Sequence, residues 1–135
     1  MEEYVCLNCG KIILDKKSVK RNFCTKTCQQ DYQYKKYIEE WKNGKQDGIR
    51  GNYGISRYIR KYLFNKYNCK CQLCGWGEVN KYTNLIPLEL HHIDGNYKNN
   101  SENNLQLLCP NCHSLTESYK SHNKNGRKIR KKYTK

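Results

Sequence analysis

The sequence predicts a small α+β protein whose fold depends on bound zinc more than on a large hydrophobic core. Isoleucine, leucine, valine and phenylalanine make up only 25 of the 135 residues, and the formal net charge is +14. Burial of so little apolar surface does not by itself offset the entropy lost on folding. Nine cysteines supply an alternative source of stability, and both helical and strand patterns occur along the chain.

The cysteines predict two zinc sites with four thiolate ligands each. We expect no secretory signal and no membrane span, and hence a cytoplasmic protein, in which structural disulfides are rare. Short spacers let neighbouring thiolates converge on one ion. The N-terminal tetrad is the less typical one, because one spacer has three residues, and its ligands could pair differently. The tetrads are Cys6, Cys9, Cys24 and Cys28, then Cys71, Cys74, Cys109 and Cys112, with Cys69 left as a free thiol.

Residues 1–31 are expected to form an N-terminal zinc finger that leads into a helix. Gly10 follows the first cysteine pair, as a tight metal-knuckle turn requires. From Thr27 to Asn43 the chain has no glycine or proline, and Gly44 comes next. The pattern predicts a helix with Thr27 as its N-cap and Gly44 just past its end.

A flexible connector and an amphipathic helix are expected next. Four glycines fall within residues 43–54, and apolar or aromatic residues recur at helical spacing over residues 55–67, with Ser56 suited to cap the helix. Tyr58 and Tyr62 are expected to pack on the core rather than on nucleic-acid bases. The candidate phosphate contacts on the other face are Arg57, Arg60 and Lys61, with a merely solvated face as the alternative.

The second half of the chain predicts a β-β-α unit whose ends are held together by the second cysteine tetrad. His91 and His92 end its first strand and His113 begins its helix, so the three imidazoles can converge on one cation. The predicted elements are a strand at residues 86–93, a turn at Asp94-Gly95-Asn96, a strand at residues 105–108 and a helix at residues 113–120.

Positive charge is concentrated on either side of this unit. The formal charge is +7 over residues 32–70 and +8 over residues 119–135, but −3 over residues 71–118. This distribution suits basic arms that hold a polyanion around a centre of carboxylates and imidazoles. The tail, expected to be disordered when free, adds the phosphate-contact candidates Arg127, Lys128, Arg130, Lys131 and Lys132.

Residues 68–119 resemble the HNH endonuclease family, the ββα-metal nucleases, and especially small phage and mobile-element members that carry a cysteine tetrad. The resemblance rests on Cys-x-x-Cys-Gly at 71–75, His91-His92-Ile93, Asn104-Leu105 and Cys-x-x-Cys-His at 109–113. The N-terminal tetrad followed by a tyrosine-rich helix is similar, less specifically, to the finger found on some phage enzymes. The resemblance implies a ββα-metal fold.

The resemblance also implies a role for each matching residue. His92 matches the general base that takes a proton from the attacking water, while His91 and His113 match ligands of one divalent cation. Asn104 matches the central asparagine, which braces the loop and orients the base. Where some relatives have a further histidine, this chain has Glu117, expected one helical turn after His113 and so a candidate third ligand. Such a mixed donor set favours Mg²⁺ or Mn²⁺.

The expected function is hydrolysis of DNA phosphodiester bonds, by nicking or double-strand cutting, in a bacterial or phage-infected cell. Double-stranded DNA is the expected partner, with no membrane contact, and the protein is expected to be a monomer or weak dimer. A non-catalytic zinc-finger DNA-binding protein is the alternative, and an RNA-cleaving enzyme is a second one. The histidines count against a purely structural finger, because four cysteines already complete the zinc site.

The expected domains are the finger (1–31), a basic tyrosine-rich helical linker (32–67), the nuclease domain (68–122) and a basic tail (123–135).

Overall fold

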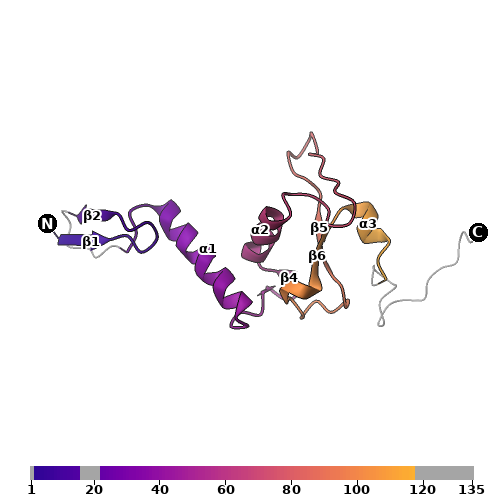
Figure 1. The fold of residues 1–135 in the computed structure, drawn as a ribbon, viewed down its shortest axis with the longest axis horizontal. Helices are drawn as coiled ribbons and strands as arrows, with labels where there is room; N and C mark the ends of the chain where they lie inside the picture. Colours follow the sequence, from indigo (N-terminus) through magenta and orange to yellow (C-terminus); the bar gives the residue numbers. More distant parts are fainter. Residues whose placement is uncertain (1, 16–21, 118–135) are drawn as a thin grey trace, which may run out of the picture. The chain divides into compact units, whose positions relative to one another are not determined.

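The computed structural model describes residues 2–15 and 22–117, and the chain divides into two compact units, Met1–Gln46 and Asp47–Lys135 (Figure 1). The helical linker expected at residues 32–67 spans the division between these units, and the four domain boundaries stay a prediction. Within the described ranges no helix is long and apolar enough to cross a membrane.

The first unit begins with a β-hairpin that carries the first cysteine pair in its turn. Strand β1 (Glu2–Val5) pairs antiparallel with β2 (Ile12–Asp15), and Val5 lies opposite Ile12. Gly10, in the turn, has a φ of +75°, a left-handed conformation that favours glycine. The expected knuckle turn is therefore present.

Helix α1 (Lys26–Lys42) starts two residues before Cys28, which would be the first helical residue after a cap at Thr27. The prediction that Thr27 is the N-cap is wrong, because the side-chain oxygen of Thr25 accepts the hydrogen bond from the backbone N–H of Cys28, at 3.1 Å. Gly44, at φ +75°, follows the end of the helix as predicted.

A short hairpin opens the second unit where a flexible connector is predicted. Strand β3 (Ile49–Arg50) pairs with β4 (Gly54–Ile55). Helix α2 (Arg57–Lys66) then begins at its predicted cap, since the Ser56 hydroxyl accepts a hydrogen bond from the backbone N–H of Tyr58 at 3.2 Å.

The aliphatic residues of α2 make its core contact. Ile59 and Leu63 are fully buried, whereas Tyr58 and Tyr62 are half-buried. The amphipathic pattern is therefore confirmed, but the tyrosines flank the buried stripe rather than form it.

Two strands and a short helix complete the second unit. Strand β5 (Glu89–His92) pairs antiparallel with β6 (Leu105–Leu108), with His91 opposite Gln106, and α3 (Pro110–Ser114) follows β6. A single 3₁₀ turn at Glu102–Asn104 leads into β6. The expected β-β-α order is present.

Two boundaries of this unit differ from the prediction. Strand β5 is shorter than residues 86–93, and α3 spans residues 110–114 rather than 113–120, of which 118–120 lie outside the described residues. The helix starts early because Pro110 has its φ preset for the first helical turn and Cys109 serves as N-cap. His113 consequently lies inside the helix rather than at its start.

The core of this unit is small and includes two cysteines of the second tetrad. Leu107 and Leu108 are fully buried and Leu88 nearly so, and they pack with Cys71 and Cys109. Full burial of one leucine contributes about 2 kcal/mol, so few such side chains give limited stability. The partly buried side chains around them are Phe64, Tyr67, Trp76, Ile86, Leu90 and Cys112.

Candidate active site and metal centres

The C-terminal cysteine tetrad has the geometry of a tetrahedral metal site. The sulfur atoms of Cys71, Cys74, Cys109 and Cys112 all lie within 4.8 Å of one another. Those of Cys74 and Cys109 are 3.7 Å apart, far longer than the ~2.05 Å bond of a disulfide. Thiolates bound tetrahedrally at ~2.3 Å from zinc are about 3.8 Å apart. The tetrad therefore fits zinc, as predicted.

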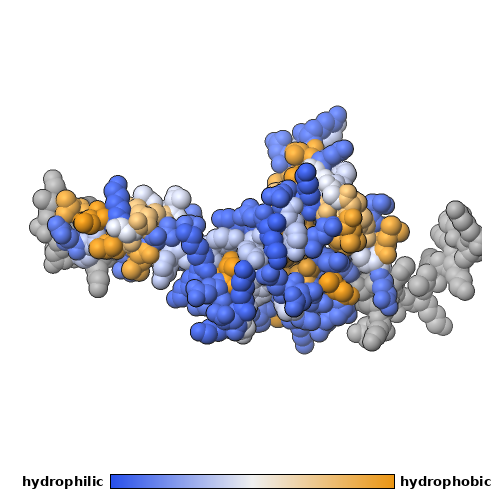
Figure 2. Space-filling view, in the orientation of Figure 1, coloured by the Kyte–Doolittle hydropathy of each residue, from blue (hydrophilic) through white to orange (hydrophobic). Residues whose placement is uncertain are grey.

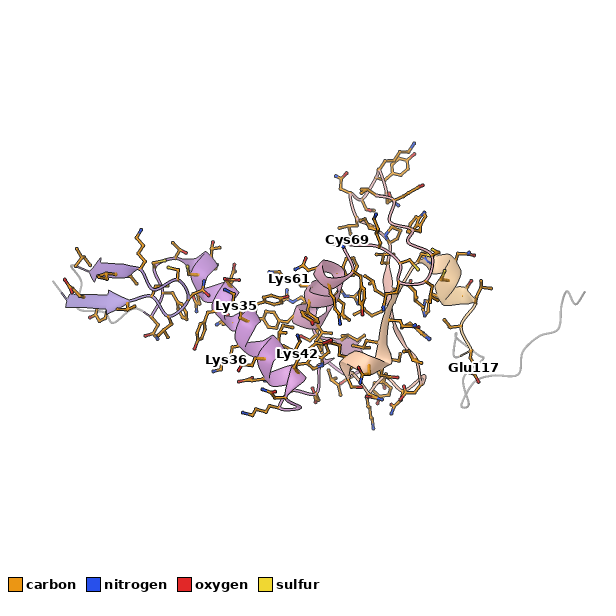
Figure 3. The ribbon with its side chains drawn as sticks, viewed as in Figure 1. Lys35, Lys36, Lys42, Lys61, Cys69 and Glu117 are labelled. Carbon is orange, nitrogen blue, oxygen red and sulfur yellow. The ribbon has the colours of Figure 1, made fainter. Side chains whose placement is uncertain are left out.

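The sulfur atoms of the N-terminal tetrad are grouped as closely as those of the C-terminal tetrad. Its four sulfur atoms lie within 4.8 Å of one another, which supports the expected grouping of Cys6, Cys9, Cys24 and Cys28. The Cys24 sulfur is 3.7 Å from that of Cys9 and 3.4 Å from that of Cys28. Cys69 belongs to neither tetrad and is half-buried just past the end of α2 (Figure 3).

Backbone hydrogen bonds prepare one cysteine of each tetrad to bind as a thiolate. The backbone N–H of Cys9 is the main cause that lowers the pKa of Cys6 to about 6. Burial raises the pKa of Cys71, but backbone hydrogen bonds, led by that from Cys109, outweigh it and bring the value to about 6. Such thiols are already deprotonated near neutral pH, which is the form that zinc binds.

Cys109 connects the second tetrad to the helix that carries His113. It follows the last residue of β6 and caps α3, where its sulfur accepts a hydrogen bond from the backbone N–H of Cys112 at 3.4 Å. Zinc held by this cysteine would therefore fix the start of α3 relative to β6, and with it the position of His113.

Strand β5 and helix α3 bring two histidines and a glutamate together. The ring centroids of His91 and His113 are 5.2 Å apart in an edge-to-face arrangement. Glu89 lies two residues before His91, so both side chains project from one face of β5. The Glu89 Oε2 atom contacts Nδ1 of His113. These three side chains form one contiguous group with two imidazoles and a carboxylate.

The surroundings of His91 favour its neutral form. Burial lowers the pKa of His91, and the charges of the nearby His113 and His92 rings lower it further. A neutral imidazole keeps the lone pair that a metal ligand needs. His91 is thus ready to bind a cation at ordinary pH.

His92 has different partners from His91. Successive residues of a strand point to opposite faces, and Nε2 of His92 lies 2.7 Å from Oδ1 of Asn100. Asn100 is only 3% exposed, and its Nδ2 donates a hydrogen bond to the backbone oxygen of Asp47 at 3.2 Å. Of the three imidazoles expected to converge, the structure therefore pairs His91 with His113 and holds His92 separately.

Asn104 braces the turn that follows β5. Its side-chain oxygen accepts a hydrogen bond from the backbone N–H of Asp94, and its Nδ2 donates to the carboxylate of Asp94 and to the backbone oxygen of Asn99. Its backbone oxygen accepts from the N–H of Ile93 at 2.9 Å. These contacts fix the two residues directly after His92.

Glu117 lies outside the helix that carries His113. The expected spacing of one helical turn after His113 is wrong, because α3 ends at Ser114 and Glu117 lies beyond its end (Figure 3). Within the part of the chain that the structure describes, only the two cysteine tetrads bring three or more potential metal donors of this kind within 4.8 Å. The carboxylate in contact with His113 is that of Glu89.

The basic residues of α2 lie on its solvent side. Arg57, Arg60 and Lys61 are exposed, opposite the buried Ile59 and Leu63. Hydrophilic side chains cover much of this part of the surface (Figure 2). The basic residues expected to bind phosphate in the tail, between positions 127 and 132, lie outside the described residues.

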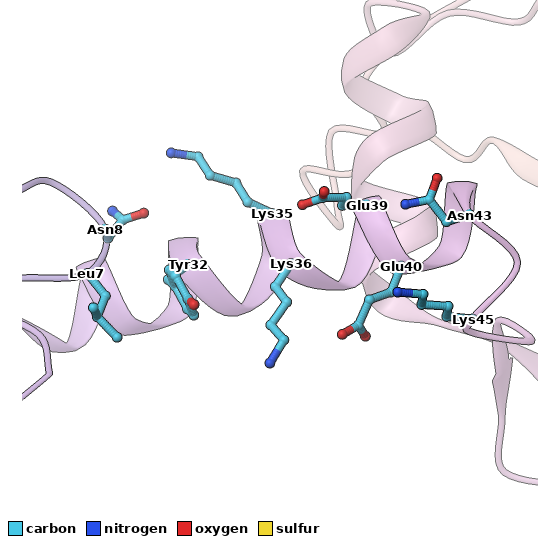
Figure 4. A pocket seen from close by; sticks show the side chains of 9 residues that line it. All are labelled: Leu7, Asn8, Tyr32, Lys35, Lys36, Glu39, Glu40, Asn43 and Lys45. Atoms are coloured by element: carbon cyan, nitrogen blue, oxygen red, sulfur yellow. The ribbon is translucent and has the colours of Figure 1, made fainter.

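A hollow of about 470 Å³ lies along α1 in the first unit (Figure 4). Its lining mixes lysines with glutamates, among them Lys35, Lys36, Glu39 and Glu40, and includes neither histidine nor cysteine. The hollow therefore offers no imidazole that could act as a general base and no thiolate ligand, whereas His91, His92 and His113 all belong to the second unit.

Two residues at the site are missing from the sequence prediction. Glu89 could have been found, because a residue two positions before His91 in a predicted strand shares its face. Asn100 is one of 16 asparagines in the chain, and no spacing or composition signal distinguishes it from the others.

Residues 71–118 match the family model described as HNH endonuclease. The curated H-N-H endonuclease F-TflIV of Escherichia phage T5 is 38% identical to this chain over 96 residues, which make up 70% of the chain and 39% of that relative. The chain thus spans well under half of the length of this relative. No solved structure matches the chain significantly. The family match runs from the first ligand of the second tetrad through β5, β6 and α3.

Proposed function

Because residues 71–118 match the HNH endonuclease family model, we propose that the chain is a metal-dependent endonuclease that hydrolyses phosphodiester bonds of DNA. The observation that carries this proposal is the pairing of His91 with His113, with His92 as the next residue of the strand. Two imidazole donors and a separately held imidazole are the parts that a one-metal hydrolysis requires. The similarity to a phage nuclease supports a phage or mobile-element origin.

His91 and His113 are the proposed ligands of the catalytic cation. When bound, a divalent cation stabilises the negative charge that develops on the phosphate and on the leaving oxygen. A donor set of nitrogen and carboxylate oxygen suits Mg²⁺ or Mn²⁺. Glu89 is the carboxylate next to this pair, and Glu117 as a further ligand stays a prediction.

His92 is the proposed general base. It takes a proton from a water molecule, whose oxygen then bonds to phosphorus as the bond to the 3′ oxygen breaks. The products are a 5′-phosphate and a 3′-hydroxyl, with the leaving oxygen protonated by solvent. Asn104 supports this step, since it fixes Ile93 and Asp94 and so limits movement of the strand end that carries His92.

The basic face of α2 is the proposed contact for the DNA backbone. Arg57, Arg60 and Lys61 are exposed on one helix, and the basic tail of residues 123–135 adds sequence-independent attraction. Duplex DNA is the proposed substrate. One chain carries one catalytic group, so a monomer would nick, and double-strand cutting would need a dimer or two successive events.

Both cysteine tetrads are proposed to hold structural zinc. Four thiolates leave no open coordination position for substrate or water, so neither tetrad supplies the catalytic cation. The two roles are therefore divided between two kinds of metal site.

The alternative is a zinc-finger protein that binds DNA without cutting it. The histidine pair favours the enzyme, because a binding protein has no use for a second cation site beside a complete zinc site. An RNA-cleaving enzyme shares this chemistry, and digestion of RNA and plasmid side by side distinguishes the two.

A nicking assay on supercoiled plasmid tests the proposal. We expect the zinc-loaded protein to convert supercoiled to open-circular DNA with Mg²⁺ or Mn²⁺ but not with EDTA present. His92→Ala should reduce the rate by about 10²- to 10⁴-fold, the range for loss of a general base, while Asn103→Ala, at an exposed position two residues before Leu105, serves as control. Nicking by His92→Ala at the wild-type rate would refute the assignment of the base.

A further inference from the structure

Asn100 is a buried primary amide in an otherwise exposed polar loop. It is 3% exposed, whereas the neighbouring Asn96 and Asn103 are exposed. An amide that loses its contact with water costs free energy unless protein groups replace the lost hydrogen bonds. Both ends of the Asn100 side chain have such partners, namely His92 and the backbone of Asp47.

The hydrogen-bond partners of Asn100 determine which of its amide atoms is the oxygen and which is the nitrogen. The backbone oxygen of Asp47, 3.2 Å away, can only accept a hydrogen bond, so the Asn100 atom that faces it is the NH₂ group. The atom 2.7 Å from His92 Nε2 is then the amide oxygen, which can only accept. The hydrogen of this contact must come from His92, and Nε2 is the protonated nitrogen of its ring.

The backbone under Asn100 is rigid and closely packed. The Asp47 carboxylate accepts a hydrogen bond from the N–H of Ile49, and the carbonyl of Gly48 accepts one from the N–H of Ser56 at 2.8 Å. A Cβ atom on Gly48 would lie 2.9 Å from Cβ of Asn100 and 2.6 Å from a methyl carbon of Ile59. The backbone at Gly48, near the start of the second unit, therefore lies in close contact with the Asn100 side chain.

From these contacts we propose that Asn100 is a positioning residue for the general base. It accepts the Nε2–H of His92, holds the ring in one orientation and selects the tautomer in which Nδ1 accepts the proton from water. The O–H bond of the water breaks, its oxygen bonds to phosphorus, and the proton ends on Nδ1 while Nε2–H stays bonded to Asn100. This inference rests on the proposed function only for the role of His92, not for the hydrogen bond itself.

The contact has a measurable effect on both structure and rate. Without an acceptor at position 100, the neutral ring can carry its hydrogen on either nitrogen and can rotate. We expect Asn100→Ala to lower kcat by about ten- to a hundredfold, within the contribution of general-base catalysis. Because Asn100 contacts His92 and the backbone of Asp47 rather than the proposed cation ligands His91 and His113, KM and the Kd for Mn²⁺ should change less than threefold.

Two variants and a control separate positioning from a purely structural role. Asn100→Asp keeps an oxygen that accepts Nε2–H but loses the donor to Asp47, and should retain more activity than Asn100→Ala. Asn103→Ala, an exposed neighbour, should match the wild type. Long-range ¹H–¹⁵N NMR of the zinc-loaded full chain reports the tautomer of His92 directly, and should show hydrogen on Nε2 in the wild type and a mixture in Asn100→Ala.

The outcomes distinguish this inference from the proposed function. A wild-type His92 with hydrogen on Nδ1 overturns the inference, and so does an Asn100→Ala protein with unchanged kcat in an active nuclease. Absence of nicking by the wild type counts against the proposed function, while the NMR measurement still decides whether Asn100 sets the tautomer. If Asn100→Ala fails to fold, as circular dichroism would reveal, the wild-type tautomer together with Asn100→Asp decides the question.

Discussion

Asn104 and Asp94 are joined by two hydrogen bonds that run in opposite directions. The backbone N–H of Asp94 donates to Oδ1 of Asn104 at 3.0 Å, and Nδ2 of Asn104 donates to the Asp94 carboxylate at 2.8 Å. Hydrogen bonds from the Asn99 side chain, the Asn96 backbone and Asn104 lower the pKa of Asp94, so this carboxylate stays ionised well into acid. The turn after β5 is therefore tied to the 3₁₀ turn that precedes β6.

Loss of Asn104 should loosen this turn and slow the reaction. Asn104→Ala leaves the N–H of Asp94 without its partner and also removes the two hydrogen bonds that the Asn104 amide donates, which should lower the free energy of unfolding. We expect a fall in kcat of tenfold or more with little change in KM, because the strand end that carries His92 is no longer fixed. Urea unfolding and plasmid nicking measure the two effects. Asn103→Ala is the matched control, and equal losses in both variants would contradict a specific role for Asn104.

Glu89 should matter for cation binding more than Glu117 does. The Glu89 carboxylate accepts a hydrogen bond from the Nδ1 side of His113, which orients the ring and makes its other nitrogen a stronger ligand. Glu89→Gln should weaken Mn²⁺ binding by about ten- to a hundredfold, the usual effect of removing such a supporting group. Glu117→Gln should change it little. Calorimetric titration of Mn²⁺ into the zinc-loaded variants measures the Kd of each. A larger loss of affinity in Glu117→Gln than in Glu89→Gln would contradict this prediction.

Zinc content should depend on the tetrads and not on the ninth cysteine. Cys109→Ser should reduce bound zinc from about two ions to about one per chain and destabilise the second unit, since this residue is buried among the core leucines. Cys69→Ser should keep both ions, because Cys69 lies outside either tetrad. Elemental analysis of the purified variants gives the count. Retention of two ions by Cys109→Ser would contradict the ligand assignment.

His91 should titrate at a lower pH than an ordinary histidine. Its pKa is lowered by burial and then by the His113 and His92 charges, so the neutral form persists below the usual value near 6.5. The unfolded chain then binds this proton more tightly than the folded one, and stability falls as the pH drops through that range. NMR titration of the zinc-loaded protein without Mg²⁺ should show this shift. His113→Ala should raise the His91 value, and a drop on that substitution would contradict the charge contribution.

The basic face of α2 should contribute to the salt dependence of DNA binding. Each phosphate contact contributes about 0.9 to the slope of log K against log salt, so removing three contacts should reduce the slope by up to about 3. Fluorescence anisotropy over a salt series measures it. A general effect of net charge would appear equally in a control that removes three lysines around the α1 hollow. The test variant combines Arg57→Ala, Arg60→Ala and Lys61→Ala, and the control combines Lys35→Ala, Lys36→Ala and Lys45→Ala.

Cysteine spacing and hydrophobic periodicity were sufficient to predict the two tetrads, α2 and the β-β-α order. These features depend on short-range rules: a two-residue spacer sets the distance between thiolates, and the helical period sets the buried stripe of Ile59 and Leu63. The family match at residues 71–118 confirms the resemblance seen in His91-His92 and Asn104.

Cysteine spacing and hydrophobic periodicity could not predict contacts between segments that are distant in the sequence. The extent of α3 was misjudged because Cys109, a member of the second tetrad, is also the N-cap of the helix, and this error placed Glu117 one helical turn after His113. Asn100 owes its burial to Asp47 and Gly48, more than 50 positions earlier, so nothing in its own neighbourhood reveals its contact with His92. Asn100 is distinguished by its burial together with its contact with His92, and both of these depend on the folded structure.

Cys109 is both the last residue before α3 and a member of the second tetrad, and the proposed function gives this dual position a consequence for the order in which the metals bind. If zinc fills the tetrad and His91 and His113 bind the catalytic cation, as proposed, the cation finds both histidines only after zinc has set the helix in place. Apoprotein refolded with Mg²⁺ alone should consequently remain incompetent, whereas zinc added first should restore a site that Mg²⁺ then fills. On the proposed mechanism, activity would then depend on the supply of zinc, although zinc would take no direct part in breaking the phosphodiester bond.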